Sequence, residues 1–317
     1  MRRIKVKAIR FLVVMLIAVA LMAGCSNNAK QAGTSTGKGK LIGISFQHMN
    51  NPFFVDLAEG ARKVVEAHGD TLVVMDSQSN SLKQKNDLSD LIMQKPAAIM
   101  INPVNWEGIK GTLIEAKRAN VPVIVVDAPV KDQSLVTCTV ASDNVKAGEL
   151  IAEELARTTR PAKIVVLALS INKACIDRVA GFKKVLAKYP DMRIVDEQEC
   201  KGTIESSRPV MRDLIGRHPD INAVFAINDP SALGCISALE SAGKLKNVKI
   251  VAVDGAKEAV AAIQEGQMLA TSAQFPKEIG RIAAEKVYEH FAGKTIEKDI
   301  KVKVELITAG NVDKFAQ

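Results

Sequence analysis

The sequence predicts an α/β protein made of two βαβ lobes, each with a parallel sheet, and three observations lead to this. Short apolar runs rich in Val and Ile alternate with longer stretches whose apolar residues recur three and four positions apart, the spacing of an amphipathic helix. The short runs lack polar alternation, which is typical of strands buried on both faces of a parallel sheet. The rhythm continues for more strands than one open sheet comfortably holds, so two domains are expected.

The elements can be predicted in order along the chain. The first half has strands predicted over 41–46, 72–75, 97–101 and 123–126, with helices over 53–68 and 82–94. The same rhythm returns after Asp143. It predicts strands over 164–169, 193–195, 223–227 and 249–253, with helices over 177–188, 206–217 and 231–242.

The composition is that of a folded globular protein rather than a disordered or fibrous one. Of the 317 residues, 47% are apolar and 25% charged, and the length allows two medium domains with buried cores. The formal net charge of +8 does not indicate a nucleic-acid partner, because five basic residues and no acidic one lie in the first 24 positions. The other 293 residues carry 38 basic against 35 acidic groups. No basic binding face is predicted.

Residues 1–24 are typical of an export signal, with a basic head followed by twelve apolar residues. Twelve helical residues are too few to cross a bilayer, which takes about 20. The segment ends in a run that resembles a bacterial lipobox, where the cysteine is acylated: Leu21-Met22-Ala23-Gly24-Cys25. An ordinary signal peptide with an incidental cysteine is the alternative. Residues 25–39, rich in Ser, Asn, Gly, Thr and Lys, are predicted to form a flexible tether.

The remaining cysteines and the histidines show no metal-binding or redox spacing. Cys138, Cys175, Cys200 and Cys235 form no CxxC pair, and the four histidines do not cluster with them, so no metal site is predicted. Cys175 and Cys200 each follow a predicted strand, and a disulfide between them in an oxidising compartment is left open. The other two are expected to be small buried hydrophobic residues.

A pair of polar residues recurs at corresponding places in the two halves. In the first half one strand is followed by Asn102, and 25 residues later the next is followed by Asp127. In the second half a strand is followed by Asn228, and 26 residues later the next is followed by Asp254. The carboxyl ends of parallel strands are the edge where open α/β sheets bind ligands. Two such edges facing across a cleft would meet one ligand from both sides.

These edges carry amides, carboxylates, one guanidinium and two aromatic rings. Such planar groups form paired hydrogen bonds with neighbouring hydroxyls, which both donate and accept, and phenylalanine rings offer apolar faces to a sugar ring. Helix capping and core packing are the alternatives for single residues, but capping does not predict the repeated Asn-then-Asp order. The candidate ligand-binding residues are Gln47, Asn51, Phe53, Phe54, Asn102, Asp127, Arg178, Asn228, Asp254 and Gln274.

Catalytic motifs are sparse. No GxGxxG follows the first strand, and neither a GxxxxGK[ST] loop nor a GxSxG elbow occurs. No catalytic residue and no cofactor are therefore assigned, and a sugar-modifying enzyme is the weaker alternative class.

The order of several short motifs resembles the ribose-type periplasmic sugar-binding proteins, which are substrate receptors of ABC importers. The resemblance covers about residues 40–308. Besides the lipobox, it rests on Asn50-Asn51-Pro52-Phe53-Phe54, Met75-Asp76-Ser77-Gln78, Ile101-Asn102-Pro103, Ala141-Ser142-Asp143-Asn144, Phe225-Ala226-Ile227-Asn228-Asp229 and Val253-Asp254-Gly255.

The resemblance implies two Rossmann-like lobes joined by three hinge crossovers. The first lobe would comprise 40–142 and 275–303, and the second 143–274 and 304–317. The family's sugar contacts fall on the candidate residues above from Asn51 to Gln274. Three positions depart from the ribose binders: Ala128 replaces an arginine, Gly202 stands nearest a missing aromatic, and Gln47 replaces a smaller hydroxyl residue. Ribose itself is therefore in doubt, and a hexose, another pentose or a cyclic polyol is left open.

The sequence thus predicts an extracytoplasmic, monomeric lipoprotein, periplasmic in a cell with an outer membrane. It would capture a monosaccharide or small polyol between its lobes and deliver it to an ABC permease, with a lipid on Cys25 as its membrane anchor and no nucleic-acid partner. Ligand binding would shift the hinge toward a closed form. A receptor for chemotaxis or a sensor kinase, or a binder of a signalling molecule, is the alternative.

Overall fold

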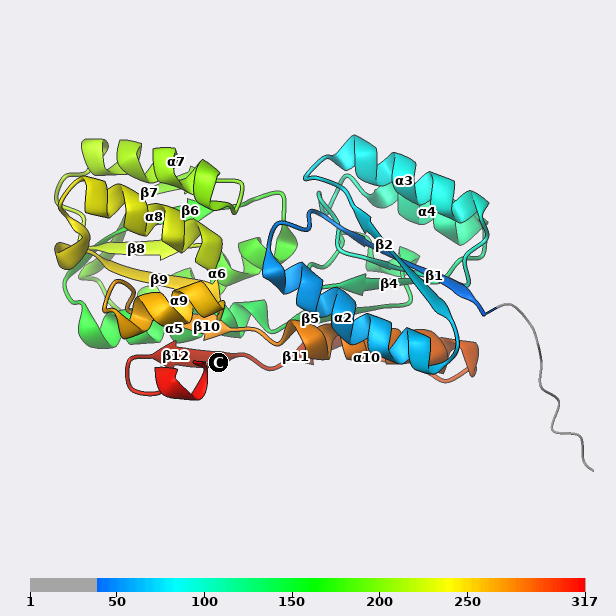
Figure 1. The fold of residues 1–317 in the computed structure, drawn as a ribbon. Coiled ribbons are helices and arrows are strands. Elements are labelled where there is room, and N and C mark those ends of the chain that lie inside the picture. The colour runs from blue at the N-terminus through cyan, green and yellow to red at the C-terminus, as the bar shows by residue number, and fades with distance from the viewer. Residues whose placement is uncertain (1–38, 317) are drawn as a thin grey trace, which may run out of the picture. The chain divides into compact units, whose positions relative to one another are not determined.

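The computed structural model describes residues 39–316, and these form two six-stranded sheets (Figure 1). The predicted export signal, Cys25 and the tether up to residue 38 lie outside the described residues. The order of the first sheet is β11-β5-β4-β3-β1-β2, and all its pairings are parallel. Its strands are β1 (Leu41–Phe46), β2 (Thr71–Asp76), β3 (Ala98–Ile101), β4 (Val123–Val126), β5 (Cys138–Ser142) and β11 (Asp299–Val302).

The second sheet repeats this arrangement with the order β12-β10-β9-β8-β6-β7. Its pairings are parallel except between β10 and β12. Its strands are β6 (Ala162–Ala168), β7 (Met192–Glu199), β8 (Ala223–Ala226), β9 (Lys249–Asp254), β10 (Ala270–Ala273) and β12 (Glu305–Thr308). The predicted fold class and all eight predicted strands are confirmed.

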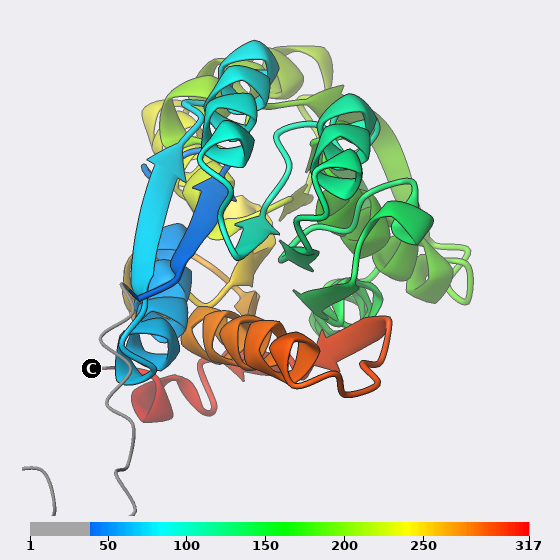
Figure 2. The ribbon, with the colours of Figure 1, turned by 90° about the vertical axis from the view of Figure 1, so that its right-hand side faces the viewer.

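Helices cover both faces of the first sheet, as Figure 2 shows from the side of this lobe. One face packs against α2 (Pro52–Ala67) and α10 (Pro276–Phe291), and the other against α3 (Ser81–Met93) and α4 (Lys110–Arg118). Helices α2 and α10 are distant in sequence but lie backbone to backbone, because a Cβ on Gly60 would stand 2.1 Å from the Lys277 carbonyl oxygen. We call this sheet and its four helices the first lobe.

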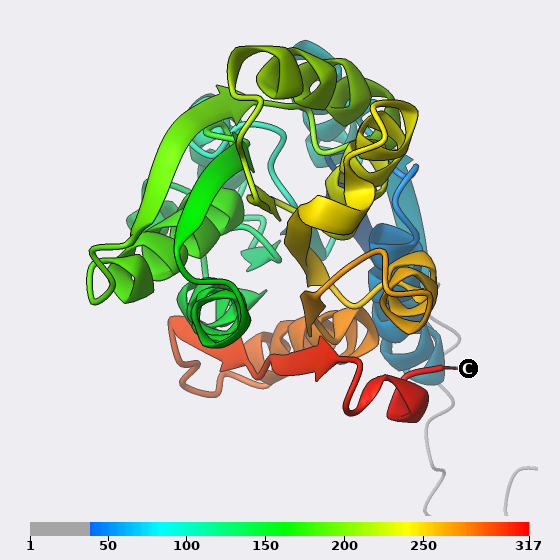
Figure 3. The same cartoon turned by 90° about the vertical axis from the view of Figure 1, so that its left-hand side faces the viewer.

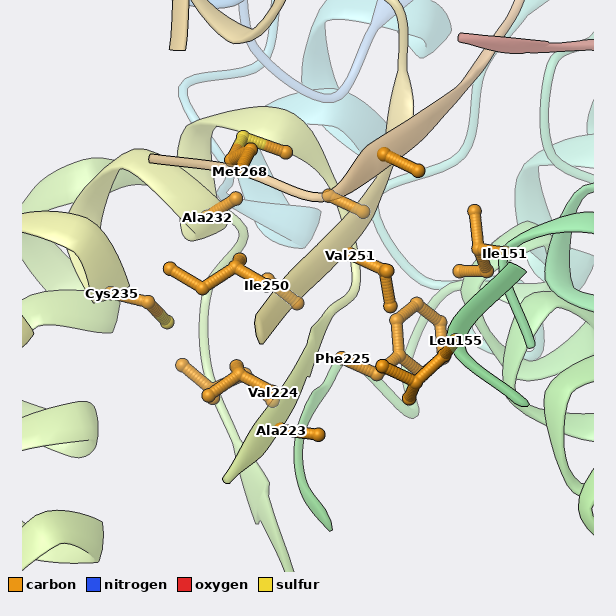
Figure 4. Close-up of a cluster of buried hydrophobic side chains, with 14 of the residues drawn as sticks. Ile151, Leu155, Ala223, Val224, Phe225, Ala232, Cys235, Ile250, Val251 and Met268 are labelled. Atoms are coloured by element: carbon orange, nitrogen blue, oxygen red, sulfur yellow. The ribbon is translucent and has the colours of Figure 1, made fainter. Parts of the chain in front are cut away.

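The second lobe, seen from its own side in Figure 3, has the same layers. Its helices are α5 (Asn144–Thr158), α6 (Lys173–Leu186), α7 (Ile204–Arg217), α8 (Asp229–Ser241) and α9 (Lys257–Gln264). Figure 4 shows Val224 and Ile250 pointing toward α8, while their strand neighbours Phe225 and Val251 point toward α5. Both faces of these strands are thus buried, as the apolar runs predicted.

The predicted helices all form, but the pattern missed several elements. The helix expected over 177–188 begins earlier, because Asn172 caps it by accepting a hydrogen bond from the Cys175 N–H at 3.2 Å. The short strand expected over 193–195 extends over all of β7. The pattern did not predict helices α4, α5, α9 and α10 or strands β5, β10, β11 and β12. Strands β5 and β10 consist largely of Thr, Ser and Ala, which give no apolar run.

Between residues 39 and 316 the chain crosses from one sheet to the other three times: after β5, after β10 and between β11 and β12. Two of these segments are joined directly, since the Asp143 N–H donates to the Val302 carbonyl at 2.9 Å. No helix in the described part of the chain is both long and apolar enough to cross a membrane. Three 3₁₀ turns complete this part: Gln133–Leu135, Leu245–Asn247 and Val312–Lys314.

Candidate ligand-binding site

A polar cavity lies between the lobes, at the carboxyl ends of strands from both sheets. Its empty space, counted with the open mouth, is about 410 Å³. Nine of the ten predicted residues line it: Gln47, Asn51, Phe53, Phe54, Asp127, Arg178, Asn228, Asp254 and Gln274.

The first-lobe wall is built by the turn from β1 into α2. The Asn51 side chain caps α2, accepting a hydrogen bond from the Phe53 N–H at 2.9 Å, and Pro52 follows at the first helical position. This cap holds Phe53 and Phe54 at the cavity, edge to face with ring centroids 5.3 Å apart. Capping and cavity lining are therefore not alternatives for Asn51, because the same side chain does both.

Asn102 does not line the cavity. It is fully buried behind Asp127, where its Nδ2 donates to the Asp127 Oδ2 at 2.8 Å and its Oδ1 accepts from the Gln47 N–H at 3.1 Å. The Asp127 backbone has φ 65°, a left-handed conformation. Strained backbone of this kind persists where surrounding contacts hold it and is common at functional sites. Asn102 thus positions Asp127 toward the cavity.

The second-lobe carboxylate, Asp254, is held by more partners. Gln274 Nε2 donates to its Oδ1 at 2.8 Å, and the Arg178 guanidinium lies 3.7 Å from the same oxygen. Asn51 of the first lobe donates to its Oδ2 at 3.5 Å, so one contact spans the two lobes. The Asp254 backbone also has an unfavourable positive φ, 147°.

Arg178 is 4% exposed, and two hydrogen bonds orient its guanidinium. Its Nε donates to the Asn144 Oδ1 at 2.8 Å and its Nη1 to the Ile227 carbonyl at 3.0 Å. These bonds use only part of its five N–H groups, which leaves donors for a bound molecule.

Asn228 is the second-lobe counterpart of Asn102, but its contacts differ. Its Oδ1 caps α8 by accepting from the Ser231 N–H at 3.0 Å, and its Nδ2 donates to the Gly202 carbonyl at 3.0 Å. Gln274, rather than Asn228, donates to Asp254. The repeated Asn-then-Asp order therefore marks equivalent strand ends without repeating the same hydrogen bond.

Burial dominates the electrostatics of the carboxyl groups. It raises the pKa of Asp127 to about 7, although Arg178 acts in the opposite direction. Burial also raises the pKa of Asp254, again against Arg178. A third carboxyl group, that of Asp229, is fully buried. Burial raises its pKa, and the negative charge of the neighbouring Asp254 raises it further. Asp229 accepts from the Ala256 N–H at 2.8 Å and the Thr271 hydroxyl at 2.6 Å, which fixes the turn after Asp254.

Sequence analysis missed several residues at the site. His48 lines the cavity, and its place between Gln47 and Asn51 was the only signal for it. Lys201 lines the second-lobe side, and Asn144 and Asp229 orient Arg178 and the Asp254 turn from behind. The further lining residues are Leu169, Asn172, Ala174, Cys175 and Gly202.

The cysteines of the described residues are free buried thiols, so Cys175 and Cys200 are not joined in this structure. Burial raises the pKa of the Cys175 thiol to about 12, which makes it an unreactive cavity wall near neutral pH. Over residues 39–316 no group of His, Cys, Asp and Glu side chains is arranged to hold a metal ion.

Two α/β lobes with a polar cavity at their facing sheet edges define the class of two-lobed solute-binding proteins. The chain belongs to the family described as the periplasmic binding protein domain, whose model matches residues 42–295.

The relatives agree with this assignment. The ribose import binding protein RbsB of Bacillus subtilis (strain 168) is 34% identical over 302 residues, covering 93% of this chain and 97% of that protein. The arabinose ABC transporter's periplasmic binding component from Shewanella sp. ANA-3, solved with α- and β-L-arabinofuranose, is 29% identical with a TM-score of 0.81. That match covers 86% of this chain and 93% of the solved one. A galactofuranose-binding protein of known structure is 26% identical with a TM-score of 0.83, over 87% and 97% of the two chains.

Proposed function

We propose that this protein is the substrate-binding component of an ABC importer and captures a monosaccharide or similar small polyol between its lobes. The observation that carries the proposal is one cavity lined from both lobes by amides, carboxylates, a guanidinium and two phenylalanine rings. Relatives named for ribose and arabinose import support a sugar ligand, and favour import over the sensing alternative.

In this proposal each lining residue has a defined task. Asp127, Asp254, Arg178, Asn51, Asn228, Gln47 and Gln274 form hydrogen bonds with the ligand's hydroxyl groups, and Phe53 and Phe54 cover its apolar face. Asn102 acts through Asp127 as a positioning residue. The protein binds its ligand without catalysing a reaction and needs no cofactor.

Closure follows from contacts made to both lobes at once. The lobes comprise 40–142 with 275–303 and 143–274 with 304–317, and move about the three crossovers. A ligand held by Asp127 on one side and Asp254 on the other stabilises the closed form, because it binds that form more tightly than the open one. The closed form then docks as a monomer on the permease.

The location is outside the cytoplasm, with the protein held at the membrane by a lipid on Cys25. This part of the proposal rests on the sequence alone. Labelling cells with a radioactive fatty acid tests it: the wild type is labelled, and a Cys25→Ala variant is not. Labelling of both proteins, or of neither, contradicts the lipid anchor.

Calorimetry tests the binding function. The panel comprises D-ribose, L-arabinose, D-galactose, D-allose and myo-inositol, titrated into wild type, Asp254→Asn and Asp254→Ala. Each hydrogen bond to a charged group contributes about 1.5–3 kcal/mol, so loss of the carboxylate is expected to weaken the preferred ligand about a hundredfold. Asp299→Ala, at an exposed position on β11, is the control and keeps wild-type affinity. Equal binding by wild type and both Asp254 variants would mean that the ligand lies elsewhere.

A further inference from the structure

Two buried polar atoms at the cavity have no hydrogen-bond partner. Among the described residues, five buried side-chain atoms lack a partner, and two of these belong to cavity-lining residues: His48 Nδ1 and Gln274 Oε1. The other three are serine hydroxyls outside the lining. Buried polar groups are nearly always paired, so two unpaired atoms on residues that line one cavity point to hydrogen bonds with a bound molecule.

His48 is fixed in place by packing rather than by hydrogen bonds. It lies two residues after the end of β1, is 8% exposed, and meets the Phe54 ring edge to face with centroids 5.2 Å apart. Asp76, at the end of the neighbouring strand β2, is the charged group that acts on it. Burial outweighs this carboxylate and lowers the pKa of His48, so the imidazole is neutral near neutral pH. A neutral imidazole has one donor and one acceptor nitrogen.

We propose that His48 is a specificity-determining contact whose Nδ1 forms a hydrogen bond with one hydroxyl group of the bound sugar. The proposal rests on the sugar-binding function proposed above. A hydroxyl suits this nitrogen in either tautomer, because it can donate to a bare Nδ1 or accept from an Nδ1–H. A methylene or hydrogen in its place leaves the nitrogen buried and unpaired, so the site discriminates against the deoxy sugar.

Gln274 complements His48 from the opposite lobe. Its Nε2 is committed to Asp254 at 2.8 Å, which directs the amide and leaves Oε1 as an acceptor. Each lobe therefore contributes one buried, unpaired atom on a cavity-lining residue, and a hydroxyl-rich molecule satisfies both when the lobes close.

The test combines variants of His48 with deoxy derivatives of the sugar that binds best in the panel above. His48→Leu keeps a similar side-chain volume without a polar atom, and His48→Asn places an amide near the position of Nδ1. His290→Leu, on an exposed histidine at the end of α10, is the matched control. Calorimetry gives the affinity of each protein for the parent sugar and for each of its monodeoxy derivatives.

Wild type and the His290 variant are expected to bind one monodeoxy derivative about tenfold more weakly than the parent sugar. His48→Leu is expected to bind that derivative and the parent sugar equally, because the two changes remove the same hydrogen bond. His48→Asn regains part of the discrimination. The ligand-free Leu variant melts at or above the wild-type temperature, since it no longer buries an unpaired nitrogen.

Three results would overturn the proposal in distinguishable ways. If wild type binds sugars and His48→Leu discriminates among the deoxy derivatives as wild type does, His48 contacts no hydroxyl, while the sugar-binding function stands. If wild type binds no sugar of the panel, both proposals fail. A Leu variant that melts well below wild type, or does not fold, assigns His48 a structural role and also contradicts the inference.

Discussion

Asp127 of the first lobe and Asp254 of the second stand at the carboxyl ends of equivalent strands in two sheets with the same order, yet they are held differently. Asp127 is held by one amide donor, Asn102, from the neighbouring strand end. Asp254 has Gln274 at 2.8 Å, the Arg178 guanidinium at 3.7 Å and, across the cavity, Asn51. Among the described residues, the two cations that line the cavity, Arg178 and Lys201, both belong to the second lobe.

In the function proposed above, this difference gives the two lobes different parts in ligand binding. The second lobe presents a carboxylate within a network of polar partners. The first lobe presents aromatic rings, His48 and a carboxyl group without a cation of its own lobe beside it. The repeated architecture places two acidic side chains face to face, and the surrounding residues then give each one a different electrostatic environment.

The largest expected effect is on the pH dependence of stability, and it comes from Asp127, the carboxyl group of the first lobe. The pKa of Asp127 is about 7 in the folded protein and about 3.9 in an unfolded chain. The folded state therefore favours the protonated form, whereas the unfolded chain ionises at a lower pH. As a result, this group lowers the free energy of unfolding by up to about 4 kcal/mol as the pH rises from about 4 to about 7. Relative to wild type, Asp127→Asn should become progressively more stable over that range.

The measurement is urea unfolding of the two ligand-free proteins between pH 4.5 and 8. Asp299→Asn, at an exposed site, serves as the control and should follow wild type. A constant difference between wild type and Asp127→Asn would show that Asp127 is ionised throughout, and the contrast between the two carboxyls would disappear.

Removal of the second-lobe cation should have the next largest effect. Arg178→Ala leaves Asp254 buried without its guanidinium and frees the Ile227 carbonyl and the Asn144 side chain. Breaking a buried ion pair from one side costs about 3 kcal/mol or more in the free energy of unfolding. Urea unfolding at pH 7 measures this loss, and Arg160→Ala, which breaks an exposed pair with Asp191, should change little. Similar losses in both variants would argue against a special role for Arg178.

The residues after the two carboxylates provide a third test. Ala128 follows Asp127, but Gly255 follows Asp254 with φ 76°, and a Cβ there would stand 2.7 Å from the Ala273 Cβ. Gly255→Ala is expected to lower the free energy of unfolding by about 2 kcal/mol, from backbone strain and overpacking together. Gly266→Ala isolates the strain, since Gly266 has φ 72° and open space around it. Equal losses in the free energy of unfolding in the two variants would show that the turn at Gly255 relaxes enough to accommodate the added methyl group.

The smallest effect concerns the cap at the second-lobe cavity wall. Asn228→Ala removes the acceptor for the Ser231 N–H, and loss of such a cap costs about 1 kcal/mol. Asn228→Asp keeps an acceptor oxygen and should restore most of the stability, measured as a melting temperature. If the Asp variant is no more stable than the Ala variant, the bond to Gly202 rather than the cap is what matters.

Six of the eight strands found by pattern contain an unbroken apolar run, and β1 and β7 are the two exceptions. Buried strands β5 and β10 escaped because they consist of small and hydroxyl-bearing residues, whose burial follows from their neighbours. At the site, the sequence predicted that Asn102 and Asp127 follow two successive strands. That Asn102 stands behind Asp127, and that His48 lines the cavity, depended on side-chain directions, which spacing does not fix.

The sequence by itself determined two parallel sheets and the polar residues at their carboxyl edges, because periodicity and strand ends are local properties of the chain. Only the tertiary structure decided which polar atoms are satisfied and which remain open to a ligand. That outcome depends on burial, since the same carboxyl or imidazole behaves differently beside a guanidinium, behind an amide or alone in a cavity. Each lobe has an Asn and then an Asp at nearly the same spacing, 102 with 127 and 228 with 254. The hydrogen bonds of these residues nevertheless differ, because they depend on neighbours from elsewhere in the chain.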